Sequence, residues 1–178
     1  MSDRFLAIIV MGVSGAGKST VAAALAARLG FALEDADAYH PPANIAKMHA
    51  GIPLTDDDRW PWLQAIADAI DRKAAAGAPA VIACSALKRA YRDVLVHGRG
   101  DVRLVYLKGS RDLIAERLAR RSDHFMPPSL LDSQFATLEE PTADENAIVV
   151  DIDAPVDDIV GAVVARLSGQ GAPQSPAA

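Results

Sequence analysis

A glycine-rich stretch near the N-terminus constrains the fold of this chain more than any other feature of its sequence. The residues Gly12-Val13-Ser14-Gly15-Ala16-Gly17-Lys18-Ser19 fit the pattern G-x-x-x-x-G-K-[ST] and follow an apolar run, Phe5–Met11. Glycines let successive backbone N–H groups turn inward around phosphates, where side chains would collide. Lys18 supplies a positive charge for the terminal phosphates, and the Ser19 hydroxyl can ligate Mg²⁺. The stretch therefore predicts a strand, a phosphate-binding loop (P-loop) and a helix, in that order.

The rest of the chain alternates short apolar runs with longer helical stretches. We expect strands at Phe5–Met11, Phe31–Glu34, Ala80–Cys84, Val102–Leu107 and Ala147–Ile152. We expect helices at Lys18–Leu29, Arg59–Ala76, Ala86–His97, Arg111–Arg121 and Val156–Leu167, with a short helical piece near Asn44–Ala50. Apolar strands separated by helices are typical of a parallel sheet covered on both faces. The pattern predicts a three-layer α/β/α fold with a five-stranded parallel sheet.

The length of 178 residues fits one domain, which we place at residues 1–167. Residues 168–178 are rich in Gly, Pro, Gln and Ala and are expected to form a disordered tail. Two segments interrupt the alternation: residues 38–60, with three prolines, and residues 117–128, where two prolines follow an arginine-rich helix end. Long irregular connections are often lids or binding loops. We therefore expect a substrate-binding insertion at 38–60 and a lid at 117–128.

Charge and composition exclude several classes of function. A net charge of −5 argues against broad nucleic-acid binding, which needs a basic face. The apolar run Phe5–Val13 is too short to span a bilayer, which takes about 20 residues, so we expect no membrane segment and a cytoplasmic location. The single cysteine, Cys84, excludes an intramolecular disulfide and a cysteine-based metal cluster.

A P-loop alone does not distinguish a kinase from a GTPase switch. The guanine-reading pattern N-K-x-D does not occur in this sequence. The residues Asp158-Ile159-Val160-Gly161 match D-x-x-G, but they lie in an amphipathic C-terminal stretch that is better explained as a helix surface. The sequence therefore favours a small-molecule kinase.

Two carboxylates follow the second expected strand. Residues at i and i+2 of an extended segment point the same way, so Asp35 and Asp37 are expected to face one site. In open α/β sheets that site is the crevice at the carboxyl ends of the strands, where the P-loop also lies. One carboxylate can hold Mg²⁺ through water while the other accepts the proton of an attacking hydroxyl.

Longer strings of the sequence resemble the gluconokinase family of P-loop kinases, relatives of shikimate kinase. The strings that carry the resemblance are Met11–Ser19, Asp37 with His40-Pro41, Asn44–Met48, Gly51–Arg59, Pro61–Leu63, Cys84–Lys88, Tyr91-Arg92, Tyr106–Gly109, His124-Phe125, Gln134-Phe135, Leu138–Pro141 and Val150–Asp153. They cover roughly residues 5–165. The resemblance implies a nucleoside-monophosphate-kinase-like fold, phosphorylation of gluconate by ATP at the 6-hydroxyl, Mg²⁺ as cofactor and a homodimer.

The resemblance also implies roles for individual residues. ATP is expected to contact Gly12, Val13, Ser14, Gly15, Ala16, Gly17, Lys18, Ser19, Thr20 and Arg117. Gluconate, a carboxylate on a chain of hydroxyls, is expected to contact Asp37, His40, Arg59, Lys88, Arg92, His124 and Gln134. A planar guanidinium such as that of Arg59 can bind a carboxylate through two hydrogen bonds. The expected metal ligands are Ser19 and Asp35.

The expected mechanism is direct transfer without a covalent enzyme intermediate. Asp37 deprotonates the acceptor hydroxyl, Lys18 holds the phosphates, and a lid arginine, Arg121 in the first instance, neutralises the developing charge. Two alternatives stay open: a kinase for another small hydroxy acid such as shikimate, and a nucleotide-binding regulator that does not catalyse. The sequence does not decide which lid arginine reaches the transferred group, or whether Asp35 binds the metal directly.

Overall fold

The computed structural model describes residues 5–121 and 128–169 of the chain. Five parallel strands form one sheet in the order β2-β3-β1-β4-β5. The strands are β1 (Ala7–Met11), β2 (Ala32–Asp35), β3 (Ala80–Ala83), β4 (Val102–Lys108) and β5 (Ile148–Asp151). The predicted five-stranded parallel sheet is confirmed, with β1 at its centre and the P-loop directly after β1.

Seven α-helices and two 3₁₀ turns connect and flank the strands in the described part of the chain. The helices are α1 (Lys18–Leu29), α2 (Pro42–His49), α3 (Asp56–Ala76), α4 (Arg89–Val96), α5 (Arg111–Ala119), α6 (Pro128–Thr137) and α7 (Val156–Ser168). The 3₁₀ turns are η1 (Ala36–Tyr39) and η2 (Ala143–Glu145). No helix in residues 5–121 and 128–169 is both long and apolar enough to cross a membrane.

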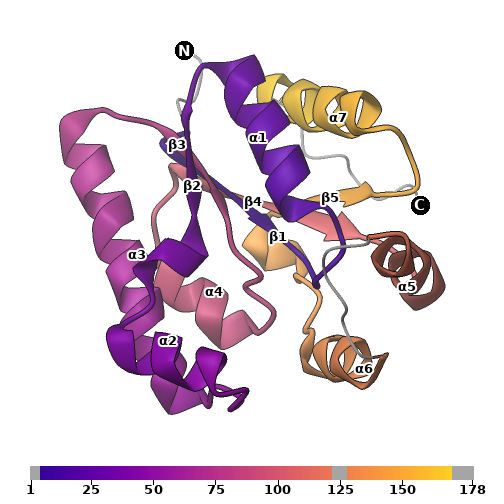
Figure 1. Cartoon of the computed structure of the whole chain (residues 1–178). Coiled ribbons are helices and arrows are strands. Elements are labelled where there is room, and N and C mark those ends of the chain that lie inside the picture. Colours follow the sequence, from indigo (N-terminus) through magenta and orange to yellow (C-terminus); the bar gives the residue numbers. More distant parts are fainter. Residues whose placement is uncertain (1–4, 122–127, 170–178) are drawn as a thin grey trace.

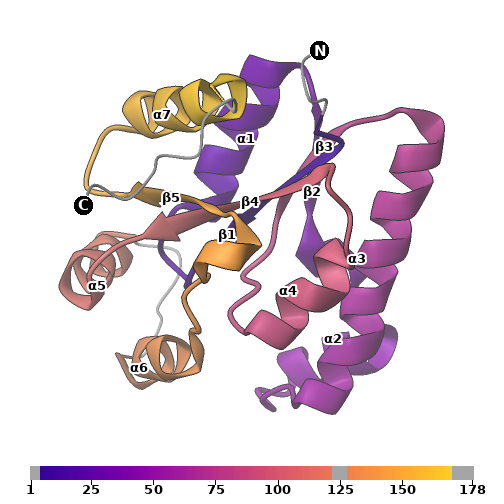
Figure 2. The same ribbon diagram turned by 180° about the vertical axis from the view of Figure 1, so that it is seen from behind.

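The alternation of side chains along β1 explains the three layers. Ile8 and Val10 pack with α1 and α7 on one face, whereas Ile9 and Met11 pack with α3 and α4 on the other. All five residues of β1 are fully buried, as expected for a central strand covered on both faces. Figures 1 and 2 show the two layers of helices and place α2 and α6 on opposite sides of the end where the strands finish.

The segment after β2 differs from the prediction. The strand runs one residue later than expected, to Asp35, and the chain then turns at once into η1. Asp37 therefore lies in a 3₁₀ turn and not in an extended segment. The Asp35 side chain caps this turn by accepting a hydrogen bond from the Asp37 backbone N–H at 2.9 Å. The prediction that Asp35 and Asp37 lie in one extended segment was wrong, because the capped turn ends β2 at Asp35.

The starts of two helices also differ from the predictions, and one helix was missed. α4 begins at Arg89 and not at Ala86, because Ala86 has a positive φ of 47°, outside the right-handed helical region. α3 begins at Asp56, where Thr55 and Asp58 form a reciprocal capping box. α6 was not predicted at all. Its sequence contains Gln134 and carries an apolar stripe too short to identify it as a helix.

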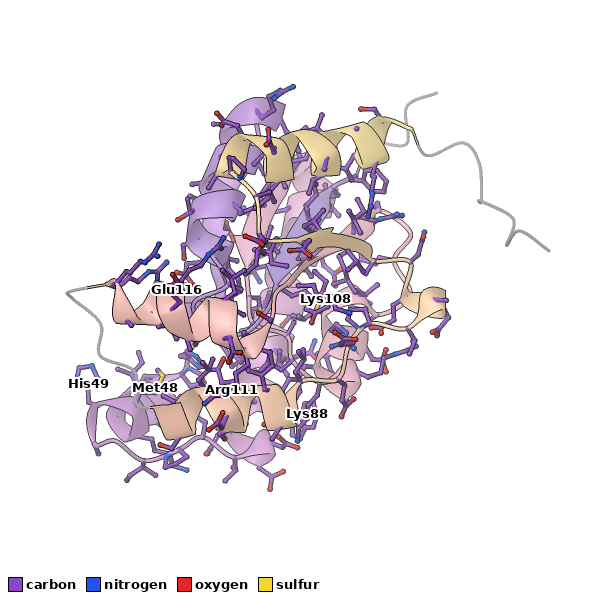
Figure 3. The ribbon with its side chains drawn as sticks, turned by 90° about the vertical axis from the view of Figure 1, so that its right-hand side faces the viewer. Met48, His49, Lys88, Lys108, Arg111 and Glu116 are labelled. Atoms are coloured by element: carbon purple, nitrogen blue, oxygen red, sulfur yellow. The ribbon has the colours of Figure 1, made fainter. Side chains whose placement is uncertain are left out.

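The predicted lid and tail lie partly outside the described residues. Of residues 117–128, the structure describes Arg117–Arg121 and the first residue of α6, Pro128. Of the tail, it describes residues 168 and 169 only. Figure 3 shows Arg111 at the junction of α5 and α6, where its Nε donates to Asp132. The two helices that flank the predicted lid are thus tied together at this point.

Candidate active site

A cavity of about 580 Å³ opens at the carboxyl end of the sheet, beside the P-loop. This volume is in the range of small-molecule sites. Its lining comes from five regions of the sequence: Ser14, Gly15, Gly17, Lys18 and Ser19; Asp35 and Asp37; Ala83, Cys84 and Ser85; Leu118 and Arg121; and Leu130 and Gln134. The fold therefore brings the P-loop, both carboxylates and one lid arginine to a common space.

The two glycines at the turn of the P-loop cannot be replaced without strain. Gly15 has a φ of +85°, and a Cβ atom there would lie 2.7 Å from Leu118 Cγ in α5. Gly17, the N-cap of α1, has a φ of +93°, and nothing lies within 4 Å of where its Cβ would be. Both conformations favour glycine. The open space beside Gly17 leaves its backbone accessible from the cavity, as a phosphate-binding loop requires.

Lys18 lies across the loop that precedes it. Its Nζ donates to the Val13 carbonyl oxygen at 3.0 Å. Burial lowers the pKa of the Lys18 amine, although nearby Cys84, Asp37 and Asp35 act in the opposite direction. The lysine is thus a partly desolvated cation beside two carboxylates, a position in which an added polyanion would interact with it strongly.

The other predicted ATP contacts differ in what they can offer a nucleotide. Val13 and Ala16 are buried in the core and Gly12 lies against β4, so these residues offer only backbone groups. Thr20 is exposed in the first turn of α1 and does not line the cavity. Arg117 donates through Nη2 to the backbone oxygen of Ile152, which ties α5 to the end of β5. Of the two predicted lid arginines in the described residues, only Arg121 lines the cavity.

Oxygen donors suited to a divalent cation meet in this cavity. The Ser19 hydroxyl and the Asp35 and Asp37 carboxylates all line it. No group of three or more His, Cys, Asp or Glu side chains converges as a metal site within residues 5–121 and 128–169. Mg²⁺ commonly takes one or two protein oxygens and completes its shell with phosphate and water. The donor set here fits that mode of binding.

Arg59 and Lys88, the predicted partners of the substrate carboxylate, both lie beside Asp56. Lys88 Nζ is 3.0 Å from Asp56 Oδ2, and Arg59 Nη1 is 3.6 Å from Asp56 Oδ1. Tyr91 completes the group: its hydroxyl donates to Asp56 and accepts from Arg59 Nη1 at 3.3 Å. The Tyr91 hydroxyl and Lys88 hold the pKa of Asp56 below its usual value. The structure brings the two cations together around an ionised carboxylate, outside the lining of the cavity.

Arg92 does not reach the cavity. Its side chain is 1% exposed and pairs with Glu145, with Nε 2.6 Å from one carboxylate oxygen and Nη2 3.1 Å from the other. Nη1 donates to the backbone oxygens of Ala86 and Leu87. These bonds fix the loop between β3 and α4, where Ala86 is in its left-handed conformation. The geometry gives Arg92 a structural task in place of the predicted contact with substrate.

Gln134 contacts the P-loop. Its Oε1 accepts from the Ser14 backbone N–H at 2.7 Å, and its Nε2 donates to the Ser14 hydroxyl at 2.9 Å. This pair of bonds attaches α6 to the phosphate-binding loop. Gln134 also lines the cavity, so the predicted contact with a substrate hydroxyl stays a prediction.

The two predicted histidines have different outcomes. His40 is buried, stacks on Trp62 with ring centroids 4.3 Å apart, and is absent from the cavity lining. His124 lies outside the described residues. Sequence reasoning gave no role to Ser85, Asp56 or Tyr91, although these residues line the cavity or hold the predicted cations. The only sequence signal was their place within the strings that resemble gluconokinases.

Burial raises the pKa of the Cys84 thiol to about 12, so the side chain is a neutral thiol at the cavity wall. Cys84 is 3% exposed and belongs to the core between the sheet, α3 and α4. In this environment Cys84 acts as a small hydrophobic residue and not as a nucleophile.

Comparison with known proteins identifies the family. Residues 8–141 match a protein-family model described as an AAA domain. A gluconokinase from Gluconobacter oxydans (strain 621H) is 52% identical over 153 residues, which cover 84% of this chain and 83% of that protein. The crystal structure of a gluconokinase from Sinorhizobium meliloti 1021 is similar with a TM-score of 0.83 at 48% identity, over 93% of this chain and 94% of that one.

A more distant likeness concerns the fold alone. Shikimate kinase from Aquifex aeolicus vf5 has a TM-score of 0.58 at 16% identity, over 92% of this chain and 96% of that one. The predicted P-loop kinase fold is thus confirmed by both a similar and a distantly related structure. With a P-loop, paired carboxylates and close sequence identity over most of its length, the chain belongs to the gluconokinase family.

Proposed function

We propose that the protein transfers the γ-phosphoryl group of ATP to the 6-hydroxyl of D-gluconate, giving ADP and 6-phosphogluconate. The observation that carries the proposal is that Lys18, Ser19, Asp35 and Asp37 line the same cavity. Family membership supports gluconate as the acceptor, because relatives that cover most of this chain are named gluconokinases.

The P-loop end of the cavity holds the nucleotide. Backbone N–H groups around Gly15 and Gly17 face the phosphates, and the α1 N-terminus adds its positive dipole end. Lys18 exchanges its contact with the Val13 carbonyl for the β- and γ-phosphates. Ser19 and Asp35 would hold Mg²⁺, which would supply charge neutralisation on the phosphate oxygens.

Asp37 serves as the general base. It takes the proton of the 6-hydroxyl as the oxygen forms its bond to the γ-phosphorus, and the bond from that phosphorus to the β,γ-bridging oxygen breaks. ADP leaves with the bond electrons. Arg121, on the same cavity wall as Leu118, neutralises the charge that develops on the transferred group. Positioning and electrostatics supply the acceleration.

The cation pair Arg59 and Lys88 receives the gluconate carboxylate. Asp56 keeps both side chains close together and charged in the absence of substrate. A second carboxylate approaching Arg59 and Lys88 competes for the same donors. Since Arg59 is partly exposed, its guanidinium can turn from Asp56 towards the cavity without unfolding the helix.

Further properties belong to the proposal and rest on the family resemblance and on the sequence alone. The lid is residues 117–128, with Arg117 assigned to ATP and His124 to gluconate, and the insertion at 38–60 forms the acceptor side of a single domain, residues 1–167. The cofactor is Mg²⁺. The assembly is a homodimer, which light scattering after gel filtration would test. The location is cytoplasmic, and the partners are ATP and gluconate, without nucleic acid or membrane.

An ADP-release assay over a panel of acceptors tests the proposal. Gluconate, shikimate, glycerate and nucleoside monophosphates are compared at equal concentration with ATP and Mg²⁺. We expect turnover with gluconate to exceed that with every other acceptor, because unpaired polar groups in a site penalise analogues that lack a hydroxyl by up to about 10⁴-fold. Preference for another acid would reject gluconate. Nucleotide binding without turnover on any acceptor would support a non-catalytic regulator.

The Asp37→Asn variant tests the mechanism separately from the substrate. Loss of a general base lowers kcat by roughly 10²–10⁴-fold. The fold should persist, since the Asp37 side chain is 82% exposed and holds no buried group in place. Near wild-type phosphorylation of gluconate by this variant would remove the proposed role of Asp37 while leaving the substrate assignment intact.

A further inference from the structure

The histidine beside the proposed base is buried and does not line the cavity. The His40 side chain is 4% exposed and lies face to face with the indole of Trp62, with an interplanar angle of 13°. Its Nε2 is 3.8 Å from Asp37 Oδ1, whereas the Asp37 side chain is 82% exposed. A fixed imidazole thus stands next to a carboxylate that few other contacts restrain.

The neighbours of Asn44 determine which nitrogen of His40 carries the proton. Asn44 is 3% exposed, and its Nδ2 lies 2.8 Å from the Asp58 backbone oxygen. A carbonyl oxygen only accepts, so the amide nitrogen must face it. The same nitrogen lies 3.2 Å from His40 Nδ1. With one N–H directed to Asp58, the other is directed to His40, and Nδ1 must be an unprotonated acceptor.

The proton of neutral His40 therefore sits on Nε2, the atom that faces Asp37. Burial lowers the pKa of His40, with Arg59 acting in the same direction and Asp37 opposing it, which agrees with a neutral ring. A doubly protonated ring would place an Nδ1–H against the Asn44 N–H. The contact from Asn44 and the stacking on Trp62 together fix both the orientation and the tautomer of this donor.

We propose that His40 is a positioning residue, which donates from Nε2 to Oδ1 of Asp37 and so leaves Oδ2 free to take the proton of the acceptor hydroxyl. The 3.8 Å separation is longer than a hydrogen bond, and such contacts at catalytic groups commonly shorten when substrates bind. Asn44, which is itself bonded to the N-terminus of α3, holds His40 in this orientation. This inference rests on the proposed function, because it assigns Asp37 the role of base.

The N-terminal cap of α3 explains why Asn44 is held in place. Thr55 and Asp58 form the capping box that starts this helix, and Asp58 also pairs with Lys47 of α2 at 2.8 Å. The Asp58 carbonyl that orients Asn44 is therefore fixed by two elements. A chain of buried contacts runs from the α3 N-terminus through Asn44 and His40 to an exposed catalytic carboxylate.

Two substitutions of His40 separate positioning from packing. His40→Phe keeps a flat ring on Trp62 and removes the donor, and we expect kcat to fall roughly 10- to 100-fold, the scale of a misplaced catalytic group. The KM values for ATP and gluconate should stay within about twofold, because His40 is buried and does not line the cavity. His40→Gln returns an N–H near the position of Nε2 and should recover most of the lost kcat. A variant with His40→Phe that keeps at least half of the wild-type kcat would overturn the proposal.

The double variant asks whether His40 acts through Asp37. In the Asp37→Asn background, His40→Phe should lower kcat by less than about twofold, because the group that it positions is gone. Full additivity of the two losses would overturn the proposal. His97→Phe is the matched control: His97 is exposed at the end of α4 and does not line the cavity, and this change should leave kcat unaltered.

The tautomer of His40 can be measured without catalysis, so this test does not depend on the identity of the substrate. Long-range ¹H–¹⁵N spectra of the wild-type protein at neutral pH report the tautomer of each of the four histidines, and comparison with His40→Phe assigns the signal of His40. We expect a neutral ring protonated at Nε2. A ring protonated at Nδ1, or a charged ring, would overturn the inference even if gluconate is phosphorylated. If the acceptor panel rejects gluconate, the variants are compared with the preferred acceptor.

Discussion

The two ends of the proposed active site are built in different ways. The phosphate end consists of consecutive residues, Gly12–Ser19, whose backbone groups form the binding surface. The acceptor end takes side chains from α3 and from the loop between β3 and α4, and these side chains bind one another before any ligand arrives. The first site is local in sequence, whereas the second exists only after folding.

The difference shows where side-chain identity is informative. At the P-loop, the pattern of glycines and one lysine specifies both the shape and the charge of the site. At the acceptor end, three of the predicted cations have equal charge but unequal availability. Arg59 and Lys88 both pair with Asp56 and stay partly exposed, whereas Arg92 is buried in an ion pair with Glu145. Charge alone did not distinguish a ligand from a structural partner.

The largest expected effect concerns Lys18, at the phosphate end of the site. Lys18→Ala removes the cation that the P-loop holds, and we expect kcat/KM for ATP to fall on the order of 10³-fold, since one lost electrostatic donor commonly costs 10²–10³. Stability should change little. Steady-state ADP release measures the effect. Lys108→Ala, which removes a surface lysine paired with Glu140 at 3.2 Å, should behave as wild type (Figure 3). Equal losses in both variants would contradict a specific role.

The next effect separates a structural arginine from a binding one. Arg92→Met removes both guanidinium hydrogen bonds from the buried Glu145 carboxylate, and we expect the free energy of unfolding to fall by roughly 3 kcal/mol, as for other broken buried pairs. Urea denaturation measures this change. Arg89→Met, which removes the exposed pairs with Asp93 and Asp144 and a longer contact with Glu145 at 3.8 Å, should lower stability much less. A raised KM for gluconate with unchanged stability would instead restore Arg92 as a substrate ligand.

A smaller effect tests whether Arg59 belongs to the acceptor site. Arg59→Ala should raise KM for gluconate about 10- to 100-fold, because a charge-assisted hydrogen bond is worth roughly 1.5–3 kcal/mol. kcat and KM for ATP should stay within about twofold. Initial rates over a range of gluconate concentrations provide the measurement. Arg72→Ala, at an exposed site on the same helix, is the control. An unchanged KM for gluconate in Arg59→Ala would refute the assignment.

The smallest expected effect concerns acid stability of the acceptor side. Lys47 and the Thr55 cap lower the pKa of Asp58 from 3.8 to about 2. A carboxyl whose pKa is lower in the folded protein stabilises it above the unfolded pKa, and this contribution disappears as the pH falls through the folded value. Asp58→Asn should therefore be less stable than wild type at pH 7, with the difference shrinking between about pH 4 and pH 2.

Thermal unfolding of both proteins over this pH range checks the prediction. A constant difference between wild type and Asp58→Asn across all pH values would show that the ion pair of Asp58 with Lys47 contributes nothing. Asp57→Asn is a useful comparison, because Asp57 also lies in the first turn of α3 and no hydrogen bond or ion pair of its side chain occurs among the described residues. At pH 7 its loss of stability should be smaller than that of Asp58→Asn.

Most of the sheet could be predicted because its strands are short apolar runs between helices. All five strands were found, and their boundaries shifted by a few residues at most. The errors lie where a side chain or a backbone angle decides the boundary. Asp35 capped a turn and ended β2, and Ala86 delayed the start of α4. The short helix α6 escaped prediction because it lacks both a clear cap and a long apolar period.

The sequence by itself determined the P-loop and the five strands, because those features depend on neighbours along the chain. Tertiary structure alone decided that Arg92 pairs with Glu145, that Gln134 holds Ser14, and that His40 stands behind Asp37. Each of these contacts joins a side chain to a partner that folding selects. Burial then decides whether a polar group pairs internally or stays free for a ligand, and burial is a property of the packed molecule.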